Sequence, residues 1–272
     1  IFKPQFVFTF LDNNVDFYKL AATFPKTKFI AIQNGQRANY ANQMGFGFFD
    51  LLKKESVDCK LSAHAICVLG TTAADQYTKY IHAKQVVTGS LKNNLIGNQI
   101  EPVEHFDIVY VSQHAPFEIP NSEVKFFFGS KSITASEFYA VELKIVRFLA
   151  ARSKQTNQSF AVLGKRTDSS PYEREFFSSA ASPNTVRFIP RTSETSTYEF
   201  CNSASLIVTA DSTIGYEFLA RGNKVVFLSG RTNAVSNELS REIHDTDFGF
   251  PLEVGTSGPF WTNKASESEF EQ

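Results

Sequence analysis

The sequence is poor in cysteine and has no long hydrophobic run, and each absence excludes a class of protein. Its three cysteines (Cys59, Cys67 and Cys201) are an odd number without CxxC spacing, which argues against a disulfide framework or structural zinc site. No stretch approaches the roughly 18 apolar residues of a membrane helix, and no basic segment precedes an apolar one as in a signal peptide. We therefore expect a cytoplasmic protein whose cysteines are small core residues.

Charge and motif content exclude further classes. A net charge of -1 with interspersed signs provides no basic stripe for a phosphate backbone, so nucleic acid is not an expected partner. The fingerprints GxSxG, GxGxxG and that of a P-loop do not occur. Asp245-Thr246-Asp247 matches the DxD of metal-dependent transferases, but that motif normally follows a mid-chain strand. We therefore expect neither a metal site nor a cofactor.

The second half alternates short apolar runs with helix-length segments, the pattern of a parallel sheet with crossover helices. Strands are expected at Phe160–Leu163, Thr185–Ile189, Leu206–Thr209 and Lys224–Leu228. Helices are expected between them, at Pro171–Ala181, Thr195–Ser203 and Thr213–Arg221. The sequence thus predicts one Rossmann-like unit here.

The first half repeats this pattern less regularly. Strands are expected at Gln5–Phe10, Lys28–Ile32, Ala65–Leu69, Gln85–Thr88 and Asp107–Ser112, and helices at Val15–Phe24 and Ala73–Ile81. A long helix, Ala135–Ser153, is expected to connect the halves. We predict an N-terminal Rossmann-like domain over residues 1–134, incomplete because the chain begins without methionine, a C-terminal one over 135–247 and an irregular tail over 248–272.

Ligands of open α/β sheets bind at the carboxyl ends of the strands, where free N–H groups of helix N-termini favour anions. After Leu206–Thr209 come Asp211, Ser212 and Thr213, which are suited to holding a phosphate, and Glu217, which is suited to ribose hydroxyls. The alternative is an ordinary helix cap with a solvated glutamate. Gly164, Lys165 and Arg166 follow another strand and suit a nucleotide phosphate, although they would also suit a solvated turn.

Polar residues also follow two strands of the first half. Asp12 and Asn13 come after one strand, and Gln33, Asn34 and Arg37 come after the next. Asp12 is a candidate base or nucleophile, and the amides are candidates for orienting sugar hydroxyls. The alternatives are an Asx turn that caps the helix at Val15 and a tight turn at Asn34-Gly35.

These landmarks resemble the bacterial surface carbohydrate biosynthesis proteins, which are similar to GT-B transferases of the sugar acid Kdo. The resemblance is carried by five segments spread in order along the chain: Thr9–Asn14, Ile32–Arg37, Gly89–Asn94, Asp211–Glu217 and Gly258–Thr262. It implies an α/β fold of two Rossmann-like domains with mostly parallel sheets facing a cleft. It also implies transfer of a sugar from a nucleotide donor, CMP-Kdo among the candidates, to a growing surface polysaccharide without a metal.

The expected partners are therefore a nucleotide sugar and a glycan or glycolipid acceptor. Peripheral association with membrane-bound polysaccharide assembly machinery at the inner face of the inner membrane is compatible with this interpretation. Three alternatives stay open: a nucleotide-sugar 2-epimerase, a CDP-polyol phosphotransferase and a non-catalytic glycan-binding protein. Product analysis separates the enzymes, and the binding protein predicts sugar binding without nucleotide affinity.

Overall fold

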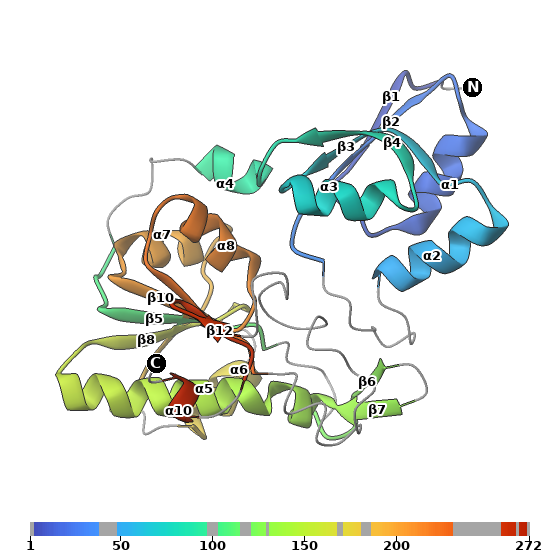
Figure 1. Ribbon diagram of the computed structural model, residues 1–272. Helices are drawn as coiled ribbons and strands as arrows, with labels where there is room; N and C mark the ends of the chain where they lie inside the picture. The colour runs from blue at the N-terminus through green and yellow to red at the C-terminus, as the bar shows by residue number, and fades with distance from the viewer. Residues whose placement is uncertain are drawn as a thin grey trace. The chain divides into compact units, whose positions relative to one another are not determined.

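The computed structural model in Figure 1 divides the chain into two compact units, each described here by itself. Unit 1 comprises Ile1–Ala41 and Phe46–Asn98, and unit 2 comprises Asn42–Gly45 and Gln99–Gln272. The structure describes residues 3–37, 48–96, 103–114, 121–128, 131–167, 171–180, 186–230, 257–264 and 267–270. Within these ranges, no helix combines the length and apolar character that crossing a membrane requires.

Unit 1 contains a four-stranded parallel sheet in the order β1-β2-β3-β4. Its strands are β1 (Phe6–Thr9), β2 (Lys28–Ile32), β3 (Ser62–Val68) and β4 (His82–Val87). Its helices are α1 (Val15–Thr23), α2 (Phe48–Asp58), α3 (Thr71–Thr78) and α4 (Leu91–Ile96). The sequence predicted all four strands and two of these helices, but α2 and α4 went unrecognised.

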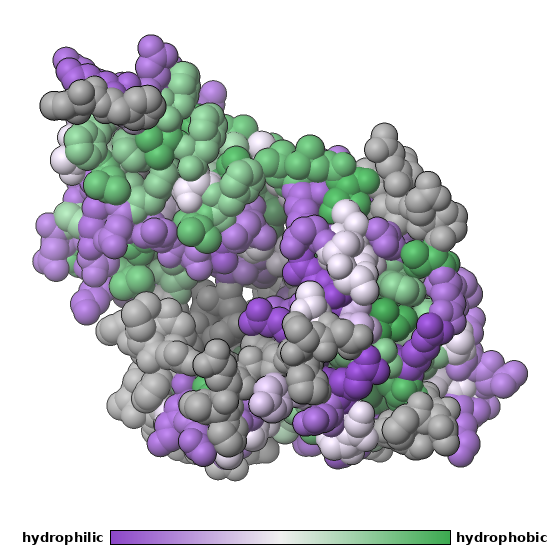
Figure 2. Space-filling model, turned by 180° about the vertical axis from the view of Figure 1, so that it is seen from behind, coloured by the Kyte–Doolittle hydropathy of each residue, from purple (hydrophilic) through white to green (hydrophobic). Residues whose placement is uncertain are grey.

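One face of this sheet is covered by α1, α2 and α3. Alternate residues of β2 and β3, such as Phe29 and Ile66, join Tyr18, Leu52 and Tyr77 of these helices in a single buried core. On the opposite side of the sheet, Phe6 and Phe8 of β1 and Phe10 just after it are all exposed. Seen from behind, hydrophobic residues accordingly gather over unit 1 (Figure 2).

Unit 2 contains a seven-stranded sheet in the order β12-β13-β11-β10-β5-β8-β9, in which only β12 is antiparallel to its neighbour. The strands are β5 (Ile108–Val111), β8 (Phe160–Leu163), β9 (Arg187–Ile189), β10 (Leu206–Thr209), β11 (Val225–Leu228), β12 (Ser257–Gly258) and β13 (Trp261–Thr262). A separate antiparallel hairpin, which the sequence did not reveal, pairs β6 (Lys125–Phe128) with β7 (Lys131–Thr134). Every residue of β5 and β8 is buried, as expected of central strands covered on both faces.

Helices cover both faces of the large sheet (Figure 1). On one face lie α5 (Ala135–Thr156), α6 (Pro171–Ser178) and α10 (Glu267–Phe270), which pack on Tyr110, Val162 and Val208. On the other lie α7 (Ser196–Ser203) and α8 (Thr213–Ala220). A capping box between Thr134 and Glu137 begins α5, where Glu137 accepts a bond from the Thr134 backbone N–H at 2.6 Å.

This topology corrects two expectations from the sequence, one about the domain boundary and one about the tail. The boundary at residue 134 is wrong, because β5 pairs with β10 and β8 in the centre of the second sheet, and the units divide near residue 98. The helix at Ala135 therefore belongs to unit 2 and does not connect the units. The tail over 248–272 is not wholly irregular, since β13 adds to the sheet beside β11.

Candidate functional site

Asp12 is the centre of the polar cluster at the carboxyl edge of the unit 1 sheet. Its side chain is 0% exposed, and both of its carboxylate oxygens are occupied. Oδ1 accepts from the Asn34 backbone N–H at 3.1 Å, and Oδ2 accepts from Arg37 Nε at 2.8 Å. A second Arg37 nitrogen and the Tyr77 hydroxyl also donate to this carboxylate. Asp12 thus ties the end of β1 to the loop after β2 and to α3.

The other first-half candidates divide between this cluster and its surface. Gln33 is buried and bridges two loops, because it donates to the Gly35 carbonyl at 3.0 Å and accepts from the Leu69 backbone N–H at 2.9 Å. Arg37 also donates to the Asn34 side chain and lies over the Phe48 ring. Asn13 is exposed.

This geometry favours a positioning role for Asp12 over the expected role of base or nucleophile. A base or nucleophile must reach a reacting atom, whereas the Asp12 carboxylate is enclosed and holds four donors. Burial, followed by the charge of Asp12, raises the pKa of the Tyr18 and Tyr77 hydroxyls, so both stay protonated donors. The Asx turn weighed as an alternative is present, since Asn14 accepts from the Asp16 backbone N–H and caps α1.

In unit 2, the strand order identifies where a ligand is expected. From β5 the chain moves outward through β8 to β9, then returns to the other side of β5 and continues through β10, β11 and β13. This is the doubly wound order of a Rossmann sheet, and its direction reverses between β5 and β10. The carboxyl ends of these two strands lead to Ser112-Gln113-His114 and to Ala210-Asp211-Ser212. Ligands of such sheets bind at this reversal.

The loop of Gly164, Lys165 and Arg166 lies at the same edge, after β8. Its backbone is held by Glu173 of α6, which accepts from the N–H groups of Lys165 at 2.9 Å and Arg166 at 3.0 Å. The Ser112 hydroxyl donates to the same carboxylate at 2.6 Å. The side chains of Lys165 and Arg166 are exposed. Buried Glu173 thus fixes the backbone of a loop that carries two cations at the sheet edge.

Gly164 has a packing role that the sequence did not suggest. A Cβ at this position would lie 2.7 Å from Phe188 Cζ and 3.3 Å from Glu173 Oε2. Glycine is therefore required for the loop to pass over β9 and the carboxylate. Burial raises the pKa of Glu173, although the hydrogen bonds from Lys165, Ser112 and Arg166 oppose this shift.

The strand-to-helix junction after β10 forms as predicted, with α8 beginning at Thr213. Ser212 occupies the N-cap position with an extended backbone, but its hydroxyl caps no N–H of α8. Gly215 brings the helix onto the sheet, because a Cβ there would lie 2.7 Å from Thr209 Cγ2 and 2.8 Å from a Phe227 ring carbon. Glu217 is buried and accepts from the Tyr198 hydroxyl at 2.6 Å, so it is not the solvated charge weighed as an alternative.

Besides Glu173, the sequence did not predict Glu142 and His114, two buried polar residues that lie beside the carboxyl end of β5. The Glu142 carboxylate of α5 accepts from the Tyr110 hydroxyl and the Gln113 backbone N–H, both at 3.0 Å. His114 is 1% exposed and stacks on Phe176 of α6, with ring centroids 4.0 Å apart. The polar run Ser112-Gln113-His114 after an apolar strand is a local signal for this edge, but the sequence alone places that strand in the first domain.

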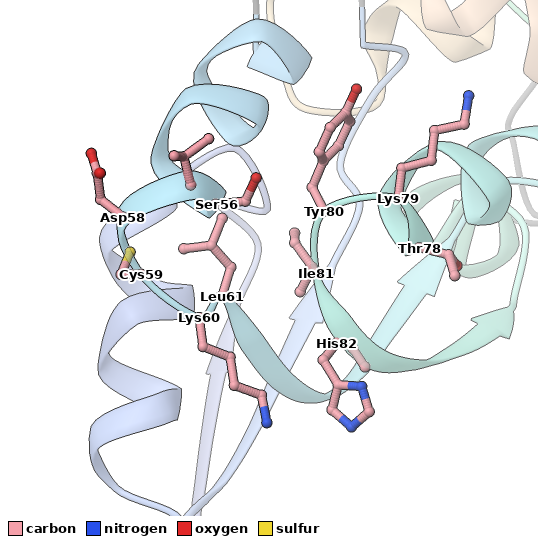
Figure 3. A pocket seen from close by; sticks show the side chains of 12 residues that line it. Ser56, Asp58, Cys59, Lys60, Leu61, Thr78, Lys79, Tyr80, Ile81 and His82 are labelled. Carbon is pink, nitrogen blue, oxygen red and sulfur yellow. The ribbon is translucent and has the colours of Figure 1, made fainter.

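A surface pocket of about 630 Å³ lies elsewhere, at the amino edge of the unit 1 sheet. Residues at the ends of α2 and α3 and at the starts of β3 and β4 line it, and Lys60, Tyr80 and His82 are among them (Figure 3). Since ligands of parallel sheets bind at the opposite edge, this pocket is not a candidate for the predicted site. The DxD-like pair Asp245 and Asp247 lies outside the described residues.

This chain is similar in structure to several solved proteins, to different degrees. S. aureus MnaA with UDP is 13% identical and has a TM-score of 0.50 over 82% of this chain and 58% of that one. A "putative UDP-N-acetylglucosamine 2-epimerase" from Listeria monocytogenes is 11% identical, with a TM-score of 0.49 over 86% of this chain and 60% of that one. E. coli heptosyltransferase WaaC with ADP-2-deoxy-2-fluoro heptose is 10% identical, with a TM-score of 0.38 over 98% and 97%.

The fold expected from the sequence is confirmed: the chain is α/β and GT-B-like, with mostly parallel sheets in two units. It spans less than two thirds of the length of MnaA and of the Listeria protein. No curated protein matches the sequence. A family model described as "putative O-antigen biosynthesis protein" matches residues 30–272, and the chain therefore belongs to this family of surface-glycan proteins.

Proposed function

We propose that the protein is a glycosyltransferase that moves a sugar from a nucleotide donor to a growing bacterial surface polysaccharide. The observation that carries this proposal is the edge of the unit 2 sheet, where a doubly wound strand order reverses beside two exposed cations. Family membership supports a surface polysaccharide as the product, because O-antigen is a surface polysaccharide. The UDP bound to MnaA, which shares the fold, supports a nucleotide as ligand.

The proposed donor site lies entirely in unit 2. Lys165 and Arg166 bind the donor phosphates, and a guanidinium can contact them with two N–H groups at once. The first N–H groups of α8 add a positive helix end, which Ser212 leaves without a side-chain cap. Asp211 and Thr213 flank this end, and Glu217 lies one turn inside the helix, where Tyr198 fixes its carboxylate.

We assign acceptor binding to unit 1, but we give its residues roles that differ from those expected from the sequence. Asp12 positions Asn34 and Arg37 by hydrogen bonds instead of acting on the substrate itself. The exposed amides of Asn13 and Asn34 are the groups of this cluster that can orient sugar hydroxyls. The acceptor is a glycan or glycolipid, so peripheral association with membrane-bound assembly machinery at the cytoplasmic face belongs to the same proposal.

A metal is not required in this proposal, because the cations and the helix end supply the positive charge that a leaving phosphate needs. The protein should therefore transfer sugar equally well in excess EDTA. Loss of activity with EDTA, and its return with manganese or magnesium, would instead make the Asp245 and Asp247 pair a metal site. CMP-Kdo, from which Kdo would be transferred, is the donor that we propose first.

A binding screen with CMP, UDP, GDP and CDP tests the proposal before any acceptor is known. One of these nucleotides should bind, and Arg166→Ala should weaken its binding about tenfold to a hundredfold, as expected for a charge-assisted contact. Arg187→Ala is the matched control, because this exposed arginine lies at the opposite, amino end of β9 and pairs with Glu104. Binding of free sugar but no nucleotide would support a glycan-binding protein. An epimerised or phosphotransfer product would support the other two alternatives.

A further inference from the structure

His114 carries a buried hydrogen-bond donor that no group of the described residues satisfies. Its Nδ1 atom is buried and has no hydrogen-bond partner among the residues that the structure describes. The other ring nitrogen, Nε2, lies 2.9 Å from the side-chain nitrogen of Asn121. An amide nitrogen can only donate, so Nε2 accepts and, in the neutral imidazole, the proton resides on Nδ1. His114 therefore holds an N–H group for which the described part of the chain provides no acceptor.

The ring is fixed in this state by its surroundings. Burial, together with the positive charge of Lys165, lowers the pKa of His114 to about 4, so the imidazole is neutral at physiological pH. Phe176 stacks on the ring and Tyr139 meets it edge-on, which leaves little freedom for the ring to turn. The His114 backbone N–H donates to Ser112 Oγ, whose hydroxyl donates to Glu173. His114 is thus linked to the acid that holds the Lys165 and Arg166 loop.

An unsatisfied buried donor is unfavourable and is rare in folded proteins, so its retention needs a reason. The Ser229 hydroxyl, which is also buried and has no partner within the described ranges, lies at the same sheet edge, just beyond the end of β11. The two residues follow strands on either side of β10, next to the reversal of strand order. Both observations point to a ligand at this edge that supplies the missing partners.

We propose that the Nδ1–H group of His114 is a binding donor for a phosphate oxygen of the nucleotide substrate. This inference rests on the proposed function and extends it by a residue outside the loops identified from the sequence. A neutral N–H next to the Lys165 cation suits an oxyanion acceptor. A neutral donor adds a hydrogen bond without adding charge, so it helps to place the phosphate rather than only to attract it.

The test compares His114→Phe with wild-type protein by calorimetric titration with the nucleotide selected in the screen. Phenylalanine keeps a ring to stack on Phe176 but removes Nδ1–H, so the dissociation constant should rise about tenfold. Affinity for the corresponding nucleoside without phosphate should not change. His64→Phe is the matched control, because His64 is exposed on β3 of unit 1, and it should bind as wild type.

A spectroscopic readout separates binding from a structural role. In 15N-labelled protein, the His114 ring should be neutral with its proton on Nδ1 from pH 5 to pH 8, and saturating nucleotide should shift that resonance. Equal affinity of wild type and His114→Phe, with no shift, would overturn the inference and leave the proposed function standing. If none of the nucleotides binds wild-type protein, both the inference and the proposed function fail.

Discussion

At the scale of single residues, buried carboxylates set the geometry of both sheet edges. Asp12, Glu142, Glu173 and Glu217 are all buried, and each accepts hydrogen bonds from a loop or tyrosine near the carboxyl ends of the strands. A buried charge is tolerated only when it is paired or fully hydrogen-bonded, so these acids favour one arrangement of their loops.

Asp12→Asn tests whether the unit 1 acid is structural. The substitution removes the charge that partners Arg37 and leaves a partly buried cation, so unfolding free energy should fall by about 3 kcal/mol or more. Chemical denaturation measures this, and nucleotide affinity should stay unchanged. Asp16→Asn, an exposed acid four residues away, should cost less than about 1 kcal/mol. A stable Asp12→Asn variant that only loses turnover would restore its role as a catalytic base.

Glu173→Gln tests the unit 2 acid through its pH dependence. The pKa of Glu173 is raised in the folded protein, so its contribution to stability is present below the unfolded pKa and declines as pH rises through the folded one. Glutamine does not titrate. The melting temperature of wild type minus that of Glu173→Gln should therefore decrease from about pH 4 to pH 8. A flat difference for Glu173→Gln would contradict the raised pKa.

Single residues also show where sequence reasoning reaches its limit. The sequence makes candidates of Lys165, Arg166 and the Asp211–Thr213 junction, because residue type and position after a strand are local signals. The enclosure of Asp12 was not predicted, because it depends on Arg37 and Tyr77, which are 25 and 65 residues away. Glu173 and His114 were missed because only tertiary packing removes them from water.

At the scale of elements, α8 depends on its close approach to the sheet. Gly215→Ala would place a methyl group within 3 Å of Thr209 and Phe227, so α8 should move away from the sheet. Overpacking of this kind lowers stability by about 1–3 kcal/mol, and the displaced helix end should weaken nucleotide binding. Melting and titration measure the two effects. Gly70→Ala is the control, since nothing lies within 4 Å of a Cβ there, and unchanged binding by Gly215→Ala would contradict a role for α8.

The elements themselves were largely predictable, since β2, β8 and β10 lie at the predicted bounds. Their apolar runs are short and clearly bounded. The assignment of β5 failed for a physical reason: its sequence predicts a buried strand, but not which sheet buries it. The short strand β13 gave no periodic signal, because two residues cannot show an alternation.

At the scale of the whole molecule, the position of β5 determines what an independent unit must contain. A fragment of residues 99–272 includes every strand of the large sheet and should fold and bind nucleotide with the affinity of the full chain. A fragment that begins at residue 135 lacks the central strand between β10 and β8, and should not fold. Circular dichroism and titration decide between them. A folded, nucleotide-binding 135–272 fragment would restore the boundary expected from the sequence.

The central claim is that a nucleotide binds at the carboxyl edge of the unit 2 sheet, where β5 and β10 mark the reversal of strand order. Amide hydrogen exchange of the full chain, with and without the nucleotide selected in the screen, tests it most directly. We expect slower exchange in the peptides that contain Ser112–His114, Gly164–Arg166 and Ala210–Ile214, and no such slowing in the Arg166→Ala variant at the same nucleotide concentration. Protection that appears instead around Lys60 and His82, in the pocket of unit 1, would contradict the account.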